Sequence, residues 1–368
     1  AVLSLPIASC TKTVEPDDSD HDDTDDTDDT DDTDDTDTDD DICTTDEETP
    51  YIVEVCDADK IYPGTTLFYE NWNRKIVEIE PSGAIVWEYE IPDDIASGSF
   101  GGGDLDLLSD GTMQLVVRNS GIWEIERDGS HQLVHPEPKI SHDADRLSNG
   151  NLIYVYGAGD TDSDSQVKEV VPGGKVEWEW KAGDYYADSF EGVEDEGWSH
   201  INGVQRLGNG HTLVSLRNFY LTTILDENGD IASEIDWSIY GSDTDPHEPV
   251  MLPTGNVLVC LQNDSPYQAV EWDPNLKDHV WTYHHPTPMR TSRDCDRLPN
   301  GNTLIVGVKN NDTTPQDTDE NEIDESMMIE VTEAGEVVWQ MTLAGVSADN
   351  SPGRFYKAIR VGDEYVND

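Results

Sequence analysis

The stretch His142-Asp-Ala-Asp-Arg-Leu-Ser-Asn-Gly150, followed by Asn-Leu-Ile-Tyr-Val-Tyr156, indicates how this chain folds. A polar turn that ends in glycine separates two short runs, and the second run is rich in β-branched and aromatic residues. Asn-Gly or Asp-Gly between such runs is the strongest short signal for a β-hairpin, because both central turn positions need positive φ. The stretch is therefore predicted to form two antiparallel strands.

The same pattern occurs four more times along the chain. The other segments are Asp104-Leu-Asp-Leu-Leu-Ser-Asp-Gly111, Asn202-Gly-Val-Gln-Arg-Leu-Gly-Asn-Gly210, His247-Glu-Pro-Val-Met-Leu-Pro-Thr-Gly255 and Arg293-Asp-Cys-Asp-Arg-Leu-Pro-Asn-Gly301. The five turn glycines are 39, 60, 45 and 46 residues apart. A repeat of this length indicates a propeller or another repeat architecture.

Each repeat continues with a second turn glycine and an alternating run that ends in tryptophan. Examples are Gly83-Ala-Ile-Val-Trp87, Gly174-Lys-Val-Glu-Trp178 and Gly335-Glu-Val-Val-Trp339, and weaker versions end at Trp237 and Trp281. Two hairpins per repeat predict one four-stranded antiparallel sheet, which buries both faces only by stacking radially on others. The tryptophans are expected to pack the sheets against one another.

The number of blades follows from the two ends of the repeat region. Residues 65–91 lack an inner strand before them, and residues 354–362 read as an inner strand with no sheet after it. Pairing these segments closes the ring and covers two open sheet edges. The fold predicted is all-β, a six-bladed β-propeller over residues 61–368 in which the N- and C-terminal parts share one blade.

The residues before the propeller have a different composition. Ile7-Ala8-Ser9-Cys10 resembles a lipobox, so residues 1–10 are interpreted as the remnant of a lipoprotein signal with Cys10 as the lipidation site; a short leader without lipid is the alternative. Residues 11–60 are interpreted as an acidic Asp/Thr-rich spacer, since residues 17–41 contain 17 Asp among 25 positions. These features predict a secreted protein, anchored by a lipid to the bacterial cell envelope.

The charge of the chain restricts its partners. The formal net charge is -59, which disfavours nucleic acid as a partner because binding to phosphate requires a basic patch. The Asp run lacks the spacing of an EF-hand, although calcium binding there stays open. Cys43 and Cys56 flank the start of the ordered region and can pair in an oxidising compartment, whereas the sequence leaves the pairing of Cys260 and Cys295 undecided.

Functional residues are expected where the inner strands line the channel. Eight residues before a turn glycine stand His142, Asn202, His247 and Arg293, and Gly103 takes this position in a Gly101-Gly-Gly103 run that is expected to keep one side of the channel open. His200 lies two residues before Asn202. The next strands end in polar residues, among them Arg217-Asn218, Gln262-Asn263 and Arg118-Asn119. Histidines with an arginine in an otherwise acidic protein favour an anionic ligand.

At this point the chain resembles the arylsulfate sulfotransferase family, bacterial enzymes that work without the nucleotide donor PAPS on a six-bladed propeller. The resemblance covers roughly residues 65–368 and rests on Ser141-His142-Asp143, Trp198-Ser-His200-Ile-Asn202 with Ser215-Leu-Arg217-Asn218, and His247-Glu-Pro-Val-Met-Leu-Pro-Thr-Gly-Asn256 with Gln262-Asn263. It implies transfer of a sulfuryl group from an aryl sulfate to a phenol, with no cofactor and no metal. The partners implied are small aryl sulfates and phenols.

The resemblance also implies a role for each matching residue. His247 matches the family's nucleophile, which carries the group as a sulfohistidine, and His142, His200 and Arg217 match residues that hold sulfate oxygens and handle the phenolic proton. Asn202, Asn218 and Asn263 are expected to contact the substrate. The chain differs from enterobacterial members in carrying the acidic spacer instead of an N-terminal β-domain, and Ser-Leu-Arg-Asn instead of Ser-Ser-Arg-His after His200.

Two other functions stay open from the sequence. A non-catalytic extracellular propeller that binds a glycan, peptide or protein would not need three histidines and Arg217 to converge. A quinone-dependent dehydrogenase of Trp-rich propeller type matches the repeat only loosely.

Overall fold

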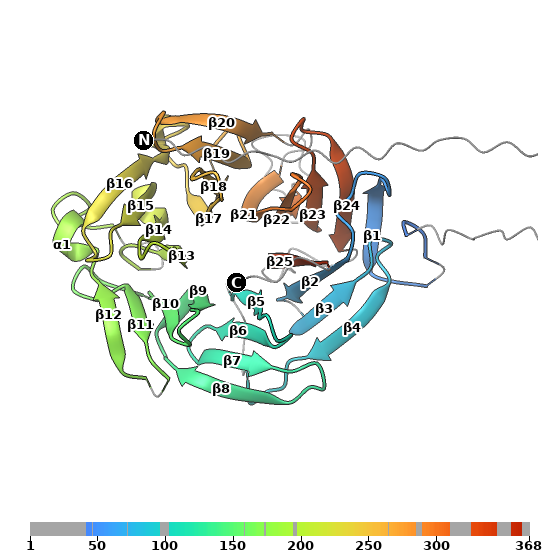
Figure 1. Cartoon of the computed structure of the whole chain (residues 1–368), viewed down its shortest axis with the longest axis horizontal. Coiled ribbons are helices and arrows are strands. Elements are labelled where there is room, and N and C mark those ends of the chain that lie inside the picture. Colours follow the sequence, from blue (N-terminus) through green and yellow to red (C-terminus); the bar gives the residue numbers. More distant parts are fainter. Residues whose placement is uncertain are drawn as a thin grey trace, which may run out of the picture. The chain divides into compact units, whose positions relative to one another are not determined.

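The chain forms a ring of six antiparallel sheets around a central channel, which confirms the predicted all-β six-bladed propeller (Figure 1). The computed structural model describes residues 42–45, 47–71, 73–95, 103–157, 159–172, 174–193, 197–263, 265–284, 289–309, 325–343 and 355–362. Cys10, Gly101, Gly102 and most of the acidic segment lie outside the described residues.

Each blade is built from strands in the order inner to outer. Blade 1 contains β25 (Phe355–Val361), β2 (Thr65–Glu70), β3 (Lys75–Ile79) and β4 (Ile85–Glu90), and blade 2 contains β5 (Leu105–Leu107), β6 (Met113–Val117), β7 (Gly121–Ile125) and β8 (His131–Pro136). Blade 3 contains β9 (Ile140–Arg146), β10 (Leu152–Tyr156), β11 (Val167–Val170) and β12 (Val176–Trp180). Blade 4 contains β13 (Ile201–Arg206), β14 (Thr212–Leu216), β15 (Leu221–Leu225) and β16 (Ile231–Asp236). Blade 5 contains β17 (Pro246–Met251), β18 (Val257–Leu261), β19 (Ala269–Asp273) and β20 (Asp278–Tyr283). Blade 6 contains β21 (Met289–Arg297), β22 (Thr303–Lys309), β23 (Glu325–Val331) and β24 (Val337–Leu343).

The short helices lie between these strands: α1 (Gly183–Tyr186), and the 3-10 helices η1 (Arg217–Phe219) and η2 (Trp237–Ile239). No helix in the described ranges is long and apolar enough to cross a membrane.

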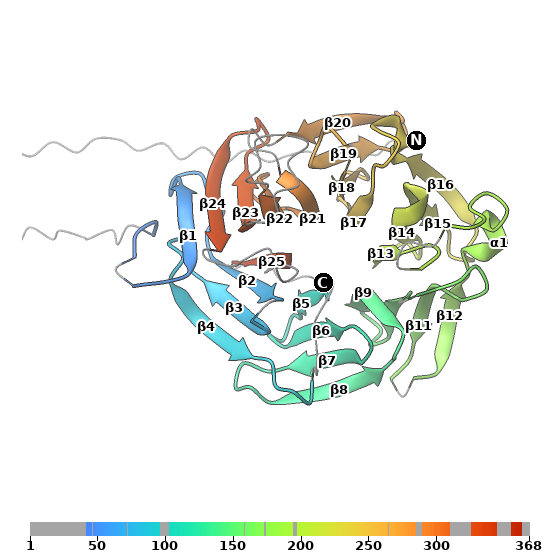
Figure 2. The same cartoon turned by 180° about the vertical axis from the view of Figure 1, so that it is seen from behind.

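The ring closes as the sequence predicts. β25 pairs antiparallel with β2, from Thr65 opposite Val361 to Glu70 opposite Phe355, so the two ends of the propeller share blade 1 (Figure 2). This pairing satisfies the backbone groups of two strands that would otherwise be open edges.

Blade 6 has a fifth strand that the sequence interpretation missed. β1 (Tyr51–Cys56) pairs antiparallel with β24, and its first residue Tyr51 is buried in the core. The propeller therefore begins before residue 61, inside the segment interpreted as spacer. Cys43 and Cys56 form a disulfide at the end of this strand, as expected for an oxidising compartment.

The hairpin turns differ in type from the prediction. In the turn after β9, Gly150 N donates to Leu147 O and Leu147 N donates to Asn151 O, and Gly150 has φ of +84°. Asn149 is not among the residues with positive φ, so this is a three-residue loop, a type I turn followed by a left-handed glycine. Pro253 and Pro299 occupy the first loop position in two repeats and preset the φ that a type I turn needs there.

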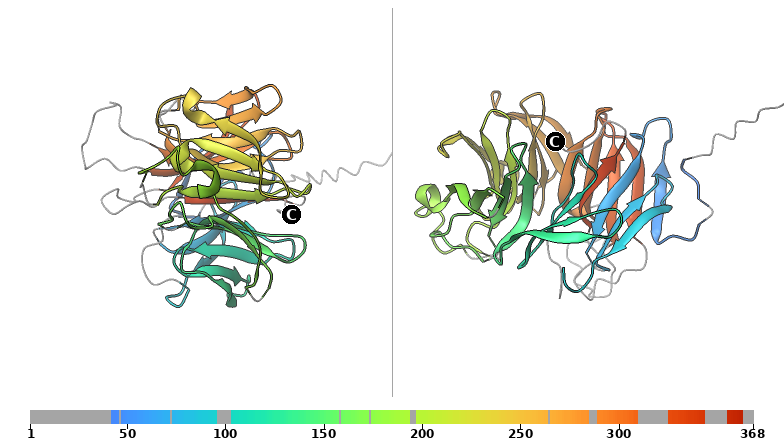
Figure 3. Two further views of the ribbon diagram at one scale, coloured as in Figure 1. Left: turned by 90° about the vertical axis from the view of Figure 1, so that its left-hand side faces the viewer. Right: turned by 60° about the horizontal axis from the view of Figure 1, so that its bottom comes forward.

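The blades pack face to face, and Figure 3 shows the sheets stacked around the ring. At several junctions an arginine of one blade lies over a tryptophan of its neighbour, with Cζ to ring-centroid distances of 4.3 Å for Arg206 and Trp178, 4.7 Å for Arg297 and Trp281 and 4.7 Å for Arg360 and Trp339. The tryptophans thus lie where packing between blades requires large flat side chains.

A second disulfide, Cys260–Cys295, joins the second strand of blade 5 to the inner strand of blade 6. Cys260 is on β18 and Cys295 is on β21, and both are fully buried. Two disulfides within the described chain fit an oxidising compartment.

Candidate functional site

The inner strands lose their regular pairing where they line the channel. β17 has one extra residue between His247 and Val250, and β25 has one extra residue between Phe355 and Ala358. β9, β13 and β21 show similar register shifts next to His142, Asn202 and Arg293. A bulge changes the direction of side chains. Neighbouring residues, which would point to opposite faces of a regular strand, can therefore both lie in the channel.

The three histidines predicted from the sequence come together around a tyrosine. The ring centroids of His142 and His200 are 5.0 Å apart, and the centroid of the Tyr356 ring is 6.1 Å from that of His142 and 5.3 Å from that of His247. The Tyr356 hydroxyl lies 3.3 Å from His247 Nε2. All four side chains are buried. They form one group, called here the histidine site, which also includes Arg217, Arg293 and Arg118.

Arg217 joins the histidine site through His200. Its Nη1 lies 3.2 Å from His200 Nδ1, and its Nη2 lies 2.8 Å from Asp245 Oδ2. Asn263 Nδ2 donates to the same carboxylate oxygen over 2.8 Å. Asp245 therefore fixes the guanidinium while leaving it next to the imidazole.

His200 is held in an unusual backbone conformation, with φ of +46°. The buried Asp160 accepts hydrogen bonds from both the backbone N and the Oγ of Ser199, over 3.1 and 2.7 Å to Oδ2. A side chain at Gly197 would meet Asp160 Oδ1 at 2.4 Å, so this loop needs glycine there. Positive φ in a non-glycine residue persists only where the surroundings hold it, which is common at functional sites.

The sequence interpretation did not assign roles to three further members of the site. Tyr356 comes from the inner strand that closes the ring, and the Arg293 Cζ lies 5.3 Å from the centroid of its ring. Arg118 is close enough to affect the charge state of His142. The positions of Tyr356 and Arg293 on inner strands were readable from the repeat, but nothing in the sequence indicated which strand residues the bulges turn inward.

His142 and His247 are neutral near pH 7. Burial lowers the pKa of His142 well below its usual range, and the neighbouring His200 and His247 lower it further. Burial also lowers the pKa of His247 well below its usual range, followed by the positive charges of Arg293 and Arg217. Burial raises the pKa of Tyr356 well above its usual range, so its hydroxyl keeps its proton. The site combines neutral imidazoles with arginine cations, which suits an anionic ligand.

The asparagines expected to contact substrate make bonds that hold the backbone. Asn202 Nδ2 donates to Pro246 O over 3.1 Å, and Asn218 Nδ2 donates to Gly197 O over 3.0 Å. Asn218 Oδ1 also accepts from Arg217 Nη1 at 3.4 Å, while Asn263 binds Asp245 as described above. These contacts place all three asparagines around the loops that carry His200, His247 and Arg217.

A second group of ionisable residues lies on the same inner strands. Four of its members, Asp143, Glu248, Asp294 and Lys357, each directly follow a residue of the histidine site. The others are Asp145, Asp296, Asp104 and Asp106. Gly203 lets β13 pack closely against β17 beside this group, because a side chain there would meet Pro249 Cδ at 2.8 Å. We call the seven carboxylates and Lys357 the acidic cluster.

Stability should depend on the protonation of this cluster. Burial raises the pKa of Asp104 and of Asp143 to about 7, from 3.8 when exposed, although the charge of Lys357 opposes the rise in both. Between these pH values the folded protein holds more protons than the unfolded chain, so raising the pH from about 4 to about 7 lowers the free energy of unfolding. Asp143→Asn is expected to reduce this pH dependence, measured as urea midpoints across the range. The exposed control Asp278→Asn should leave it unchanged, and an unchanged slope in Asp143→Asn would contradict the assignment.

Comparisons with known proteins show the fold alone. No protein-family model matches the chain, and no curated protein sequence matches it. A protein of unknown function from Bacteroides caccae is 17% identical with a TM-score of 0.57, and the match covers 81% of this chain and 98% of that one. A virginiamycin B lyase from Staphylococcus aureus is 12% identical with a TM-score of 0.46, covering 80% and 99%. A calcium-binding protein, regucalcin, from Agrobacterium tumefaciens is 14% identical with a TM-score of 0.48, covering 80% and 94%.

Proposed function

We propose that this protein is an aryl-sulfate sulfotransferase that moves a sulfuryl group from an aryl sulfate to a phenolic acceptor through a sulfohistidine at His247. The observation that carries the proposal is the convergence of three buried histidines, Tyr356 and Arg217 at one place in the channel. In a chain of net charge -59, this local group of neutral and cationic side chains selects for an anion.

The first half of the reaction uses His247 as the nucleophile. A lone pair on its imidazole forms the N–S bond, and the S–O bond to the aryl group breaks with its electron pair leaving on the phenolate oxygen. Arg217 and Arg293 offset the negative charge on the sulfuryl oxygens. The phenolate takes up a proton from His200 when that imidazole is protonated, or from water.

The second half reverses these steps with the acceptor. The acceptor oxygen forms the new O–S bond, the N–S bond breaks, and the electron pair returns to His247. The proton that the acceptor phenol loses passes to the imidazole that supplied the first one, or to water. One pocket therefore serves donor and acceptor in turn.

The direct test is turnover of 4-nitrophenyl sulfate in the presence and absence of a second phenol. We expect release of nitrophenol together with sulfation of the acceptor, both followed by chromatography. No turnover with a panel of aryl sulfates would favour the alternative, a non-catalytic extracellular propeller that binds a glycan, peptide or protein.

The pH profile should reflect the neutral state of His247. Because burial, Arg293 and Arg217 lower its pKa below the usual value, His247 stays unprotonated and nucleophilic as the pH falls to 6.5. We expect kcat/KM for the donor, which reports the free enzyme, to lose activity only below pH 6.5. An acid limb centred above that value would contradict the proposed nucleophile.

We also propose that the chain is exported and held at the bacterial cell envelope by a lipid on Cys10. The two disulfides support an oxidising compartment. Expression with its signal in a bacterial host should place the protein in the membrane fraction. Cys10→Ser should release it, whereas membrane association that persists in this variant would contradict the lipid anchor.

A further inference from the structure

The acidic cluster has far more negative than positive groups. Lys357 Nζ lies 2.8 Å from Asp104 Oδ1 and 3.1 Å from Asp106 Oδ1, and these are its closest carboxylates. Five further carboxylates share the same space, from Asp143, Asp145, Glu248, Asp294 and Asp296. One ammonium group cannot neutralise seven carboxylates.

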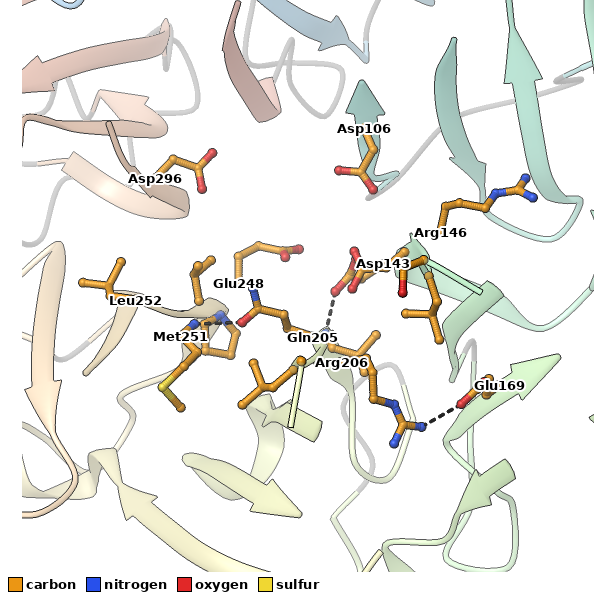
Figure 4. A pocket seen from close by; sticks show the side chains of 18 of the residues that line it. Asp106, Asp143, Arg146, Glu169, Gln205, Arg206, Glu248, Met251, Leu252 and Asp296 are labelled. Carbon is orange, nitrogen blue, oxygen red and sulfur yellow. Dashed lines mark hydrogen bonds and ion pairs between the residues drawn. The ribbon is translucent and has the colours of Figure 1, made fainter. Parts of the chain in front are cut away.

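Six of the seven carboxylates (all but Asp104) and Lys357 line a cavity of about 810 Å³ that also includes the ends of the inner strands. Figure 4 shows the carboxylates of Asp106, Asp143, Glu248 and Asp296 pointing toward the middle of this cavity. The arginines at its rim are already paired with glutamates, Arg146 with Glu124, Arg206 with Glu169 and Arg297 with Glu271. These arginines therefore do not neutralise the carboxylates inside.

Three carboxylate oxygens in the cavity have no hydrogen-bond partner within the described residues: Asp143 Oδ1, Glu248 Oε1 and Asp296 Oδ2. Asp143 and Glu248 are 3% and 6% exposed, and the other Asp143 oxygen accepts from Val204 N. The backbone of Glu248 has φ of +44°, so the bulge in β17 holds this residue in an uncommon conformation while its carboxylate enters the cavity. Burial raises the pKa of the Asp143 and Glu248 carboxyl groups, because an ionised carboxylate is costly there, and a bound cation would remove that cost.

We propose that this cavity binds an organic cation with two or more ammonium groups, a linear polyamine in chemical class. The carboxylates are distributed over inner strands of four blades around a cavity much larger than one ion. Among the described residues, no three His, Cys, Asp or Glu side chains are grouped so that they could hold a metal ion. Calcium would need six to eight oxygens at about 2.3–2.6 Å around one point. The ammonium groups of a linear polyamine are spaced along its carbon chain, so they match separated carboxylates better than a single metal ion does. Lys357 shows that a primary ammonium group fits among these carboxylates.

The test is the thermal unfolding of the full chain with spermidine at near-neutral pH and physiological salt. A ligand raises the melting temperature only if it prefers the folded state, so weak binding to acidic segments that is equal in folded and unfolded chains does not contribute. We expect a rise of roughly 5 °C at about a hundredfold excess over the dissociation constant. The rise should diminish in acid, where the cluster is protonated.

Variants separate this cavity from the rest of the acidic surface. Asp143→Asn with Glu248→Gln should abolish most of the shift, whereas the matched exposed pair Asp278→Asn with Glu90→Gln should keep it. If the first double variant does not fold, Glu248→Gln alone repeats the test. Lys357→Met removes the competing internal ammonium group and should enlarge the shift.

Other outcomes would overturn the proposal. An equal spermidine shift in both double variants would mean that binding takes place elsewhere on the acidic surface. A shift that depends on Asp143 and Glu248 but is produced by calcium or magnesium, and not by spermidine, would identify a metal site instead. No shift with spermidine would exclude the polyamine site.

Discussion

His247→Ala is expected to lower the rate of sulfuryl transfer from 4-nitrophenyl sulfate by about 10³-fold or more, because it removes the atom that forms the covalent intermediate. Measurement of initial rates should be joined by mass spectrometry of the enzyme after exposure to donor alone. The wild-type chain should gain one sulfuryl group on the peptide that contains His247, and the variant should gain none.

The matched control is His279→Ala, which changes a half-exposed histidine on the outer strand β20. Its rate should equal that of the wild type. Transfer that survives His247→Ala would remove His247 as the nucleophile. Loss of transfer in both variants would indicate that the assay reports folding rather than chemistry.

Glu330→Ala is expected to lower the free energy of unfolding by about 3–5 kcal/mol, measured by urea denaturation. Glu330 and Arg360 are fully buried, and Arg360 Nη2 lies 2.8 Å from Glu330 Oε2. The other oxygen, Oε1, accepts hydrogen bonds from Tyr62 N over 2.7 Å and from Asn302 Nδ2 over 2.6 Å. The substitution leaves a buried guanidinium without its counter-charge between blades 6 and 1.

Two further variants show whether the loss arises from the unpaired charge. Glu330→Leu combined with Arg360→Met should recover part of the stability, because a buried ion pair can be replaced by apolar side chains at little cost. Glu336→Gln, which removes one of the two acidic partners of the exposed Lys60, should leave the urea midpoint unchanged. Glu330→Ala with a wild-type midpoint would contradict the importance of the pair.

Most of the fold could be predicted from the sequence because hairpins leave local signals. The turn glycines and the Gly-x-x-x-Trp runs recur, so the number of blades and the shared blade follow from counting. Strand β1 (Tyr51–Cys56) is too short and too close to the acidic segment to carry such a signal. Its pairing with β24 depends on an edge that exists only once blade 6 has formed.

The site could be predicted in part. Equivalent positions in repeats place His142, His247 and Arg293 at one level of the channel without any knowledge of side-chain directions. The bulges could not be anticipated, since an inserted residue is invisible in a pattern of alternation. They are the reason that Tyr356 joins the histidines while the next residue, Lys357, lies among carboxylates.

The shared blade has a consequence for when the histidine site forms during folding. β2 pairs with β25, and the other five blades lie between these two strands in the sequence. Ring closure is therefore a contact of very high sequence separation and is expected to form late. The closing strand is also the one that delivers Tyr356 and Lys357 to the channel. A folding intermediate in which the other five blades have formed but β25 is not yet paired with β2 would have a nearly complete core. Its histidine site would be incomplete. Appearance of turnover during refolding would therefore report closure of the ring, later than the rise in β-sheet circular dichroism.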